Sequence, residues 1–306
     1  MESKKIKKKQ KAQYISSTVE NLFDYVEKNF SRADIHIHSD FSDSAASIEE
    51  ILNFVQDKTT LDVIAITDHD TIEGALKAQR LVKEHGYRFE VIIGEEISTT
   101  EGHLIGLFLK EKINSDISAH EAIKEIHRQG GIAIPAHPFY ISRFNDKGDE
   151  PIARGVGAAI LIHEKPEIDA IEVVNGTPVF NRNNVKAKYF NRLLLFKPEV
   201  GGSDAHMCAA IGKGYTLFEG KTAQDLKIAI QKRETQGIKD RWNPFELSKY
   251  AYSFLPNFAR IAFFTMLLGP QPKQTEIINF PSRIKINRVM PKDEKKQEEP
   301  SYQHNH

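Results

Sequence analysis

The chain has 306 residues, 40% hydrophobic and 27% charged, as is usual for a soluble globular protein with one large domain and an appendage. Its 42 basic and 42 acidic residues cancel, which excludes an overall field attracting nucleic acid or acidic lipid, although local charge in a cleft would still suffice for a nucleotide. The single cysteine, Cys208, excludes an intrachain disulfide.

The chain begins with a basic extension, residues 1–31, for which we predict one short helix. Its first part, Met1–Gln10, is rich in lysine and lacks the apolar core of a signal peptide. We therefore expect a cytoplasmic protein.

Short apolar runs then alternate with longer segments of helical periodicity as far as about Thr235. Runs such as Val63–Ile66 are apolar throughout, which is typical of strands buried on both faces of a parallel sheet. Two capping boxes, Ser47-x-x-Glu50 and Ser118-x-x-Glu121, mark helix starts. We predict strands at Ala33–Ile37, Asp62–Thr67, Phe89–Ile97, His103–Leu109, Gly131–Ala136, Ile168–Val174 and Glu199–Gly202, and helices at Ile48–Gln56, Thr71–Glu84, Ala119–Gln129, Asn184–Phe196 and Ala223–Arg233. This alternation over residues 32–240 predicts an α/β domain, either a barrel or a doubly wound sheet.

Two segments depart from this rhythm. Phe139–Lys165 is rich in Gly, Arg and Asp, so we expect a long loop or lid with a short helix. We expect residues 241–306 to form a C-terminal appendage with an apolar helix at Tyr250–Leu268, followed by a charged, disordered tail. The apolar helix is a candidate for docking on the domain, a partner or a membrane, but Pro256 and Arg260 disfavour a membrane span.

Potential metal ligands stand where several predicted strands end. His36 and His38 occupy alternate positions of the first strand, so their side chains leave the same face. His69 follows the second strand, between Asp68 and Asp70, either of which would be suited to orient a ligand imidazole. Polar residues at the ends of buried strands are where α/β folds place their chemistry.

The other candidates follow later strands. Of the neighbouring Glu95 and Glu96, we expect one to bridge two cations, and we assign Glu95 to that role and Glu96 to solvent. The remaining candidates are His103, His137, Asp204 and His206. Histidine and carboxylate ligands without thiolates favour two or three divalent ions of Mn, Zn or Fe.

These motifs, in this order, resemble the PHP (polymerase and histidinol phosphatase) family of metal-dependent phosphoesterases. The matching segments are Asp34–Ser39, Thr67–His69, Gly94–Glu96, Ala136–Pro138 and Ser203–His206. The resemblance covers about residues 32–240 and implies a distorted (β/α)7 barrel with a trinuclear site at the C-terminal ends of its strands.

The resemblance also implies a ligand set for each ion. His36, His38, Glu95 and Asp204 would hold the first ion, Glu95, His103 and His137 the second, and Asp43, His69 and His206 the third. On this basis we expect Glu95, Asp204 and His69 to act in catalysis. We also name Arg143, Arg154 and Lys213 as candidate phosphate-binding residues, because they lie in or after the motif loops.

The function expected is hydrolysis of phosphate esters by a metal-bound hydroxide. The strand His103-Leu104-Ile105-Gly106 resembles the family branch that contains small bacterial nucleotide and oligoribonucleotide phosphatases, so we expect nucleotides or short oligonucleotides as substrates and no stable nucleic-acid complex. A histidinol-phosphate phosphatase and an amidohydrolase are alternatives, although amidohydrolases commonly use a bridging lysine that is missing from these strand ends. A non-catalytic metal-binding accessory module is the alternative of another class.

Overall fold

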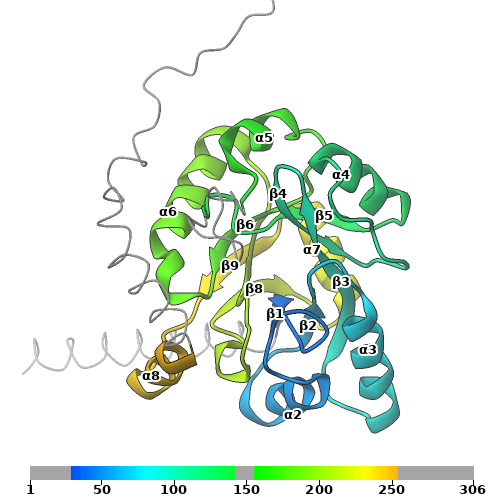
Figure 1. The fold of residues 1–306 in the computed structure, drawn as a ribbon, viewed down its shortest axis with the longest axis vertical. Coiled ribbons are helices and arrows are strands. Elements are labelled where there is room, and N and C mark those ends of the chain that lie inside the picture. The colour runs from blue at the N-terminus through cyan, green and yellow to red at the C-terminus, as the bar shows by residue number, and fades with distance from the viewer. Residues whose placement is uncertain (1–28, 142–154, 254–306) are drawn as a thin grey trace, which may run out of the picture. The chain divides into compact units, whose positions relative to one another are not determined.

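A curled, mixed β-sheet lies at the centre of the computed structural model, which describes residues 29–141 and 155–253 (Figure 1). Its order is β5-β4-β3-β2-β1-β8-β9, and a second sheet pairs β6 with β7. The strands are β1 (Phe30–Ile37), β2 (Val63–Ile66), β3 (Glu90–Thr99), β4 (Gly102–Leu107), β5 (Ile132–Pro135), β6 (Ile171–Asn175), β7 (Glu199–Gly202), β8 (Gly214–Glu219) and β9 (Thr235–Lys239). A parallel bridge between Ile37 and Ala205 brings the end of β7 beside the end of β1. The result is an α/β fold whose sheet forms a curled half-barrel.

Helices cover the outer side of these strands (Figure 1). They are α2 (Ile48–Lys58), α3 (Glu73–His85), α4 (Ala119–Arg128), α5 (Gly157–His163), α6 (Asn181–Phe190) and α7 (Ala223–Lys232). The helix α8 (Pro244–Ser253) follows β9 and stands apart from the sheet, and the chain also has the 3₁₀ turns η1 (Pro178–Phe180) and η3 (Cys208–Ala210) and the π-helix η2 (Asn191–Leu195). In α2, the buried residues Ile48, Ile51, Leu52 and Val55 recur at helical spacing, so one face packs on the sheet.

Local sequence signals correctly predicted the positions of most of these elements. Both capping boxes are confirmed, because the Ser47 and Ser118 hydroxyls accept hydrogen bonds from the backbone N–H groups of Glu50 and Glu121. Strand β2, with the sequence Val-Ile-Ala-Ile, is buried at all four positions and pairs in parallel with both β1 and β3. Each of the seven predicted strands corresponds to one of β1 to β7.

The sheet is less regular than an alternating βα barrel. β3 and β4 are antiparallel, with Thr99 paired to Gly102, so only Thr100 and Glu101 separate them and no helix intervenes. β8 and β9, which were not predicted, form a second antiparallel pair on the other edge of β1, with α7 in the connection between them. The exact count of seven βα units therefore stays a prediction.

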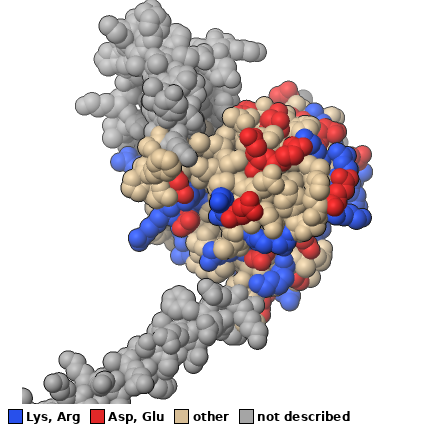
Figure 2. Space-filling view, turned by 90° about the horizontal axis from the view of Figure 1, so that it is seen from below, with Lys and Arg blue, Asp and Glu red and all other residues tan. Residues whose placement is uncertain are grey.

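Several predictions concern segments outside the described residues. They are the helix of the N-terminal extension, the middle of the Phe139–Lys165 loop, and most of Tyr250–Leu268 with the tail after it. The domain limits of 32 and 240 also stay predictions. Within the described ranges, none of the helices is long and apolar enough to cross a membrane. On the face shown in Figure 2, acidic and basic side chains are interspersed, as the zero net charge suggests.

Candidate metal centre

The histidines predicted from the motifs converge at one edge of the curled sheet. His36 and His38 stand at the end of β1, and His69 follows β2. The bridges Ile37–Ala205 and His69–Glu96 hold the ends of neighbouring strands together. Parallel strands of an α/β fold end at the same edge of the sheet, so residues far apart in sequence share this region.

Four side chains form the first candidate cation site: His36, His38, Glu96 and Asp204. The Nε2 atoms of His36 and His38 are 3.1 Å apart, and they lie 3.1 and 3.2 Å from Glu96 Oε2. Asp204 Oδ1 lies 3.5 and 3.3 Å from the same two nitrogens. A tetrahedral cation bound at 2.0–2.1 Å would set its ligand atoms about 3.3–3.4 Å apart. The donor set and its spacing therefore fit a divalent transition-metal ion.

The carboxylate of Glu96 lies at the centre of the whole cluster. Its Oε2 faces His36, His38 and also His69, whose Nδ1 is 3.5 Å away. Its Oε1 faces the other side, 2.8 Å from His103 Nδ1 and 2.9 Å from His137 Nε2. The two oxygens thus divide five imidazoles into two groups, as a carboxylate that bridges two cations would do.

A third group lies at the more exposed side of the cluster. It contains His38, Asp43, His69 and His206. Asp43 Oδ2 is 3.1 Å from His206 Nε2 and 3.8 Å from His69 Nε2. The predicted residues Asp43, His69 and His206 are thus brought together, and His38 joins them.

The structure corrects the assignment of Glu95. This residue does not belong to any of the candidate groups found among the described residues, whereas Glu96 belongs to two. Glu95 Oε2 instead accepts a hydrogen bond of 2.9 Å from the backbone N–H of Ile113. The expected exposure of Glu96 is also wrong, because Glu96 is fully buried.

The pairing of β3 with β4 explains why Glu96, and not Glu95, faces the imidazoles. Ser98 pairs with His103, and residues paired across an antiparallel ladder have side chains on the same face. Glu96 lies two positions before Ser98 and so shares the face of His103, whereas Glu95 points to the other face. The turn at Thr100 and Glu101 therefore sets which carboxylate reaches the imidazoles. A hairpin interpretation of residues 95–106 would have identified Glu96 from sequence.

An outer layer of hydrogen bonds, which the sequence did not reveal, orients the predicted ligands. Glu172 on β6 lies 3.0 Å from His36 Nδ1 and accepts the backbone N–H of His137 at 2.6 Å. Asn175 donates to Asp204 Oδ2 at 3.0 Å. A carboxylate on Nδ1 holds the proton there and leaves Nε2 free to bind a cation.

The aspartates expected to orient imidazoles serve a different purpose. Asp68 accepts hydrogen bonds from the backbone and hydroxyl of Ser39 and from the hydroxyl of Ser42. Asp70 accepts the backbone N–H of Ser98. Both carboxylates therefore hold the loops that carry the candidate ligands.

The electrostatics of the cluster are those of closely packed opposite charges. Burial by itself lowers the pKa of His38, but hydrogen bonds with Asp204 and Glu96 outweigh it and raise the pKa to about 9. Burial alone would raise the pKa of Glu96, yet the surrounding imidazoles hold it well below its usual value. Burial lowers the pKa of His69 to about 4, so its imidazole is neutral near pH 7. The cluster thus gathers ionised carboxylates in a buried place, where positive charge is needed to balance them.

The predicted phosphate-binding residues are not assembled at this cluster by the described contacts. Lys213 Nζ lies 2.7 Å from Glu246 and donates to the backbone carbonyl of Arg241, so it attaches α8 to the end of the loop before β8. Arg143 and Arg154 lie outside the described residues.

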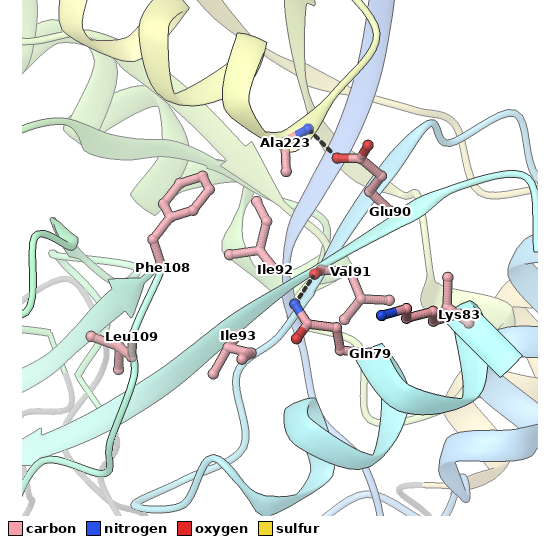
Figure 3. Close-up of a pocket in the computed structure, with 10 residues that line it drawn as sticks. Gln79, Lys83, Glu90, Val91, Ile92, Ile93, Phe108, Leu109 and Ala223 are labelled. Atoms are coloured by element: carbon pink, nitrogen blue, oxygen red, sulfur yellow. Dashed lines mark hydrogen bonds between the residues drawn. The ribbon is translucent and has the colours of Figure 1, made fainter.

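A separate cavity of about 420 Å³ lies on the outer side of β3 (Figure 3). It is lined by α3, by Glu90–Ile93 of β3, by Phe108 and Leu109 after β4, and by Ala223 at the start of α7. No helix follows β3 before β4, which leaves the space between α3 and α7 uncovered. None of the candidate ligands lines this cavity.

Comparison with known proteins agrees with the geometry. The model of the PHP domain family matches residues 34–231. An uncharacterized protein from Methanocaldococcus jannaschii is 40% identical over 154 residues, which are 47% of this chain and 81% of that protein. A 5′-3′ exoribonuclease from Haemophilus influenzae is 35% identical over 99 residues, which are 30% of this chain and 35% of that enzyme.

Two solved structures share the fold at low sequence identity. PsfC from Pseudomonas syringae has a TM-score of 0.53 and 18% identity, with 74% of this chain and 100% of PsfC covered. A two-domain protein from Bacteroides vulgatus, described as containing a predicted PHP-like metal-dependent phosphoesterase, has a TM-score of 0.52 and 19% identity, with 69% of this chain and 65% of that chain covered.

Proposed function

Because this chain belongs to the PHP domain family, we propose that it is a metal-dependent phosphoesterase acting on nucleotides or short oligonucleotides. The observation that carries the proposal is the position of Glu96. Its Oε2 lies within 3.5 Å of three imidazoles, and its Oε1 lies within 2.9 Å of two more. A buried carboxylate shared in this way has the form of a bridge between two cation sites.

Two or three divalent ions of Mn, Zn or Fe fit the residues present. In our proposal, His36, His38, Glu96 and Asp204 hold the first and Asp43, His69 and His206 the third. For the second we propose Glu96, His103 and His137, because both imidazoles face Glu96 Oε1; the structure also groups His69 with Glu96 and His103. When bound, such cations lower the pKa of the attacking water and neutralise charge on the phosphoryl oxygens.

The protein's own part is to hold these ligands in their ionisation states and orientations. Glu172 keeps the proton of His36 on Nδ1, and Asn175 fixes one oxygen of Asp204 so that the other faces the imidazoles. The two serines beside the cluster are engaged elsewhere: Ser39 donates to Asp68, and Ser203 donates to the backbone carbonyl of His36. Activation of water, with no covalent enzyme intermediate, is therefore the favoured route.

Two features support a nucleotide substrate. Tyr140 and Phe180 lie 5.8 and 5.9 Å from the His137 ring and 4.3 Å from each other, measured between centroids. Phe180 is buried and supports the ring of Tyr140, which is partly exposed beside the candidate cation sites and is the aromatic side chain on which a base would stack. The similarity to an exoribonuclease is consistent with this substrate class.

The test is release of inorganic phosphate or of mononucleotides from parallel substrates by the purified full-length protein with Mn²⁺ added. The substrates are nucleoside bisphosphates, 5′-phosphorylated oligonucleotides and histidinol phosphate, and His36→Ala is the control. We expect release from the nucleotide substrates by the wild type and none by the variant.

Two other results of this assay would change the proposal. Release from histidinol phosphate alone would replace the nucleotide assignment and keep the enzyme class. No release from any substrate by protein shown to contain bound metal would favour the accessory-module alternative.

A further inference from the structure

The outer face of α6 and the π-helix η2 exposes an unusual amount of apolar surface. Thirteen large hydrophobic side chains are exposed among the described residues, and six of them lie between residues 179 and 196. They are Val179, Val185, Tyr189, Leu193, Leu194 and Phe196, with exposed fractions of 47% to 72%. Concentrated apolar exposure of this kind marks interaction surfaces.

The helix has two apolar faces. Ala187 and Phe190 of α6 and Leu195 of η2 are buried on the side toward the sheet, which accounts for one face. Val185, Tyr189 and Leu193 recur every four residues on the opposite side, where they meet solvent. At η2 the consecutive residues Arg192, Leu193 and Leu194 are all exposed. We refer to these exposed residues of 179–196 as the α6–η2 face.

The charge of this segment has one sign. Residues 176–198 contain five basic residues and no acidic one, although the whole chain is neutral. Arg182 is exposed in the first turn of α6, and Lys188 is partly exposed in its last turn. Arg192 forms an ion pair with Glu199, at 2.7 Å, and Lys186 places its ammonium 4.5 Å from the Phe139 ring centroid. Arg182 and Lys188 therefore supply the outward positive charge.

We propose that the α6–η2 face docks on an anionic lipid membrane surface. Exposed apolar side chains interspersed with cationic ones suit a segment that lies in the interface, with its apolar groups below the headgroups and its cations among the phosphates. This inference is independent of the metal centre.

Two other occupants fit these residues less well. A second copy of the chain packed through the same face would bring like charges together, which is unfavourable. Single-stranded nucleic acid stacks on aromatic rings, whereas four of the six exposed side chains are aliphatic.

The experiment is flotation of the full-length protein with vesicles of phosphatidylcholine alone or mixed with phosphatidylglycerol. One double variant, Tyr189→Ser with Leu193→Ser, removes apolar contact, and another, Arg182→Gln with Lys188→Gln, removes charge. Leu76→Ser changes an exposed leucine on another helix, α3, and serves as the control. Thermal unfolding of each variant checks that it is folded.

We expect the wild type to float only with the anionic vesicles. Each double variant should lower the partition coefficient by about tenfold or more, and Leu76→Ser should leave it unchanged. Absence of flotation by the wild type would overturn the proposal. So would flotation of both double variants to the same extent as the wild type, which would place the contact elsewhere, for example in Tyr250–Leu268. Loss of oligonucleotide binding in these variants, without vesicle binding by the wild type, would assign the face to nucleic acid instead.

Discussion

Two adjacent glutamates show how strongly the position on a strand decides a side chain's chemistry. Glu95 and Glu96 are both buried, yet only Glu96 is surrounded by imidazoles. Burial raises the pKa of Glu95 to about 7, whereas the imidazoles hold the pKa of Glu96 far below its usual value. Successive side chains of a strand point to opposite faces, so one step along the chain separates a candidate cation-binding environment from an ordinary buried one.

This contrast gives a matched pair of substitutions, Glu96→Gln and Glu95→Gln. Both keep the size of the side chain and remove the negative charge. Since changes in residues that only orient ligands cost about 10–100-fold, loss of the shared carboxylate should lower metal affinity and turnover by about a hundredfold or more. Glu95→Gln should retain its bound metal.

Elemental analysis of the purified variants, combined with the phosphate-release assay, measures both effects. Full metal content in Glu96→Gln would contradict the bridging role. Loss of metal in Glu95→Gln, but not in Glu96→Gln, would restore the assignment made from sequence.

At the scale of elements, close approach of β7 to β1 brings Asp204 and His206 to the histidines of the first strand. Gly202 ends β7, and a Cβ atom added there would lie 2.4 Å from the Cβ of His36. Such a contact forces the two strands apart. A glycine at this position is therefore a requirement of the site as well as of the fold.

We predict that Gly202→Ala weakens metal binding and lowers the free energy of unfolding by about 1–3 kcal/mol, the usual cost of overpacking. Gly130→Ala is the control: its φ of 76° also strains an alanine, but no atom lies within 4 Å of the added Cβ. Metal titration and urea unfolding of the two variants measure the effects. Equal metal affinity in both would show that the approach of β7 does not limit the site.

The elements themselves were largely predictable, and their pairing was less so. Capping boxes and apolar runs are local signals, and they located β1 to β7 and most helices. Strand direction and register depend on contacts between distant segments, so the β3–β4 hairpin and the exchange of Glu95 for Glu96 were missed. Glu172 and Asn175 belong to no motif. Their contacts with His36 and Asp204 follow only from the position of β6 beside the cluster.

For the whole molecule, the cluster concentrates ionisable groups in a buried place. His36 and Glu96 are fully buried, and the side chain of Asp204 is 10% exposed. Burial by itself lowers the pKa of His36, but Asp204, Glu96 and Glu172 together raise it well above its usual value. Protons or cations must balance these carboxylates inside the fold. Stability and metal occupancy should therefore be linked.

Removal of the cations should consequently lower the unfolding temperature of the full-length protein. A ligand present at 100 times its dissociation constant contributes about 2.7 kcal/mol, which corresponds to about 5–10 °C for a domain of this size. Scanning calorimetry of chelator-treated protein, with metal content verified beforehand, measures the decrease, and added Mn²⁺ should reverse it. Glu96→Gln should show a smaller metal-dependent shift, because it lacks the carboxylate common to two of the groups. An unchanged unfolding temperature after complete removal of metal would mean that the cluster is balanced by protons alone and that cations add nothing to the fold.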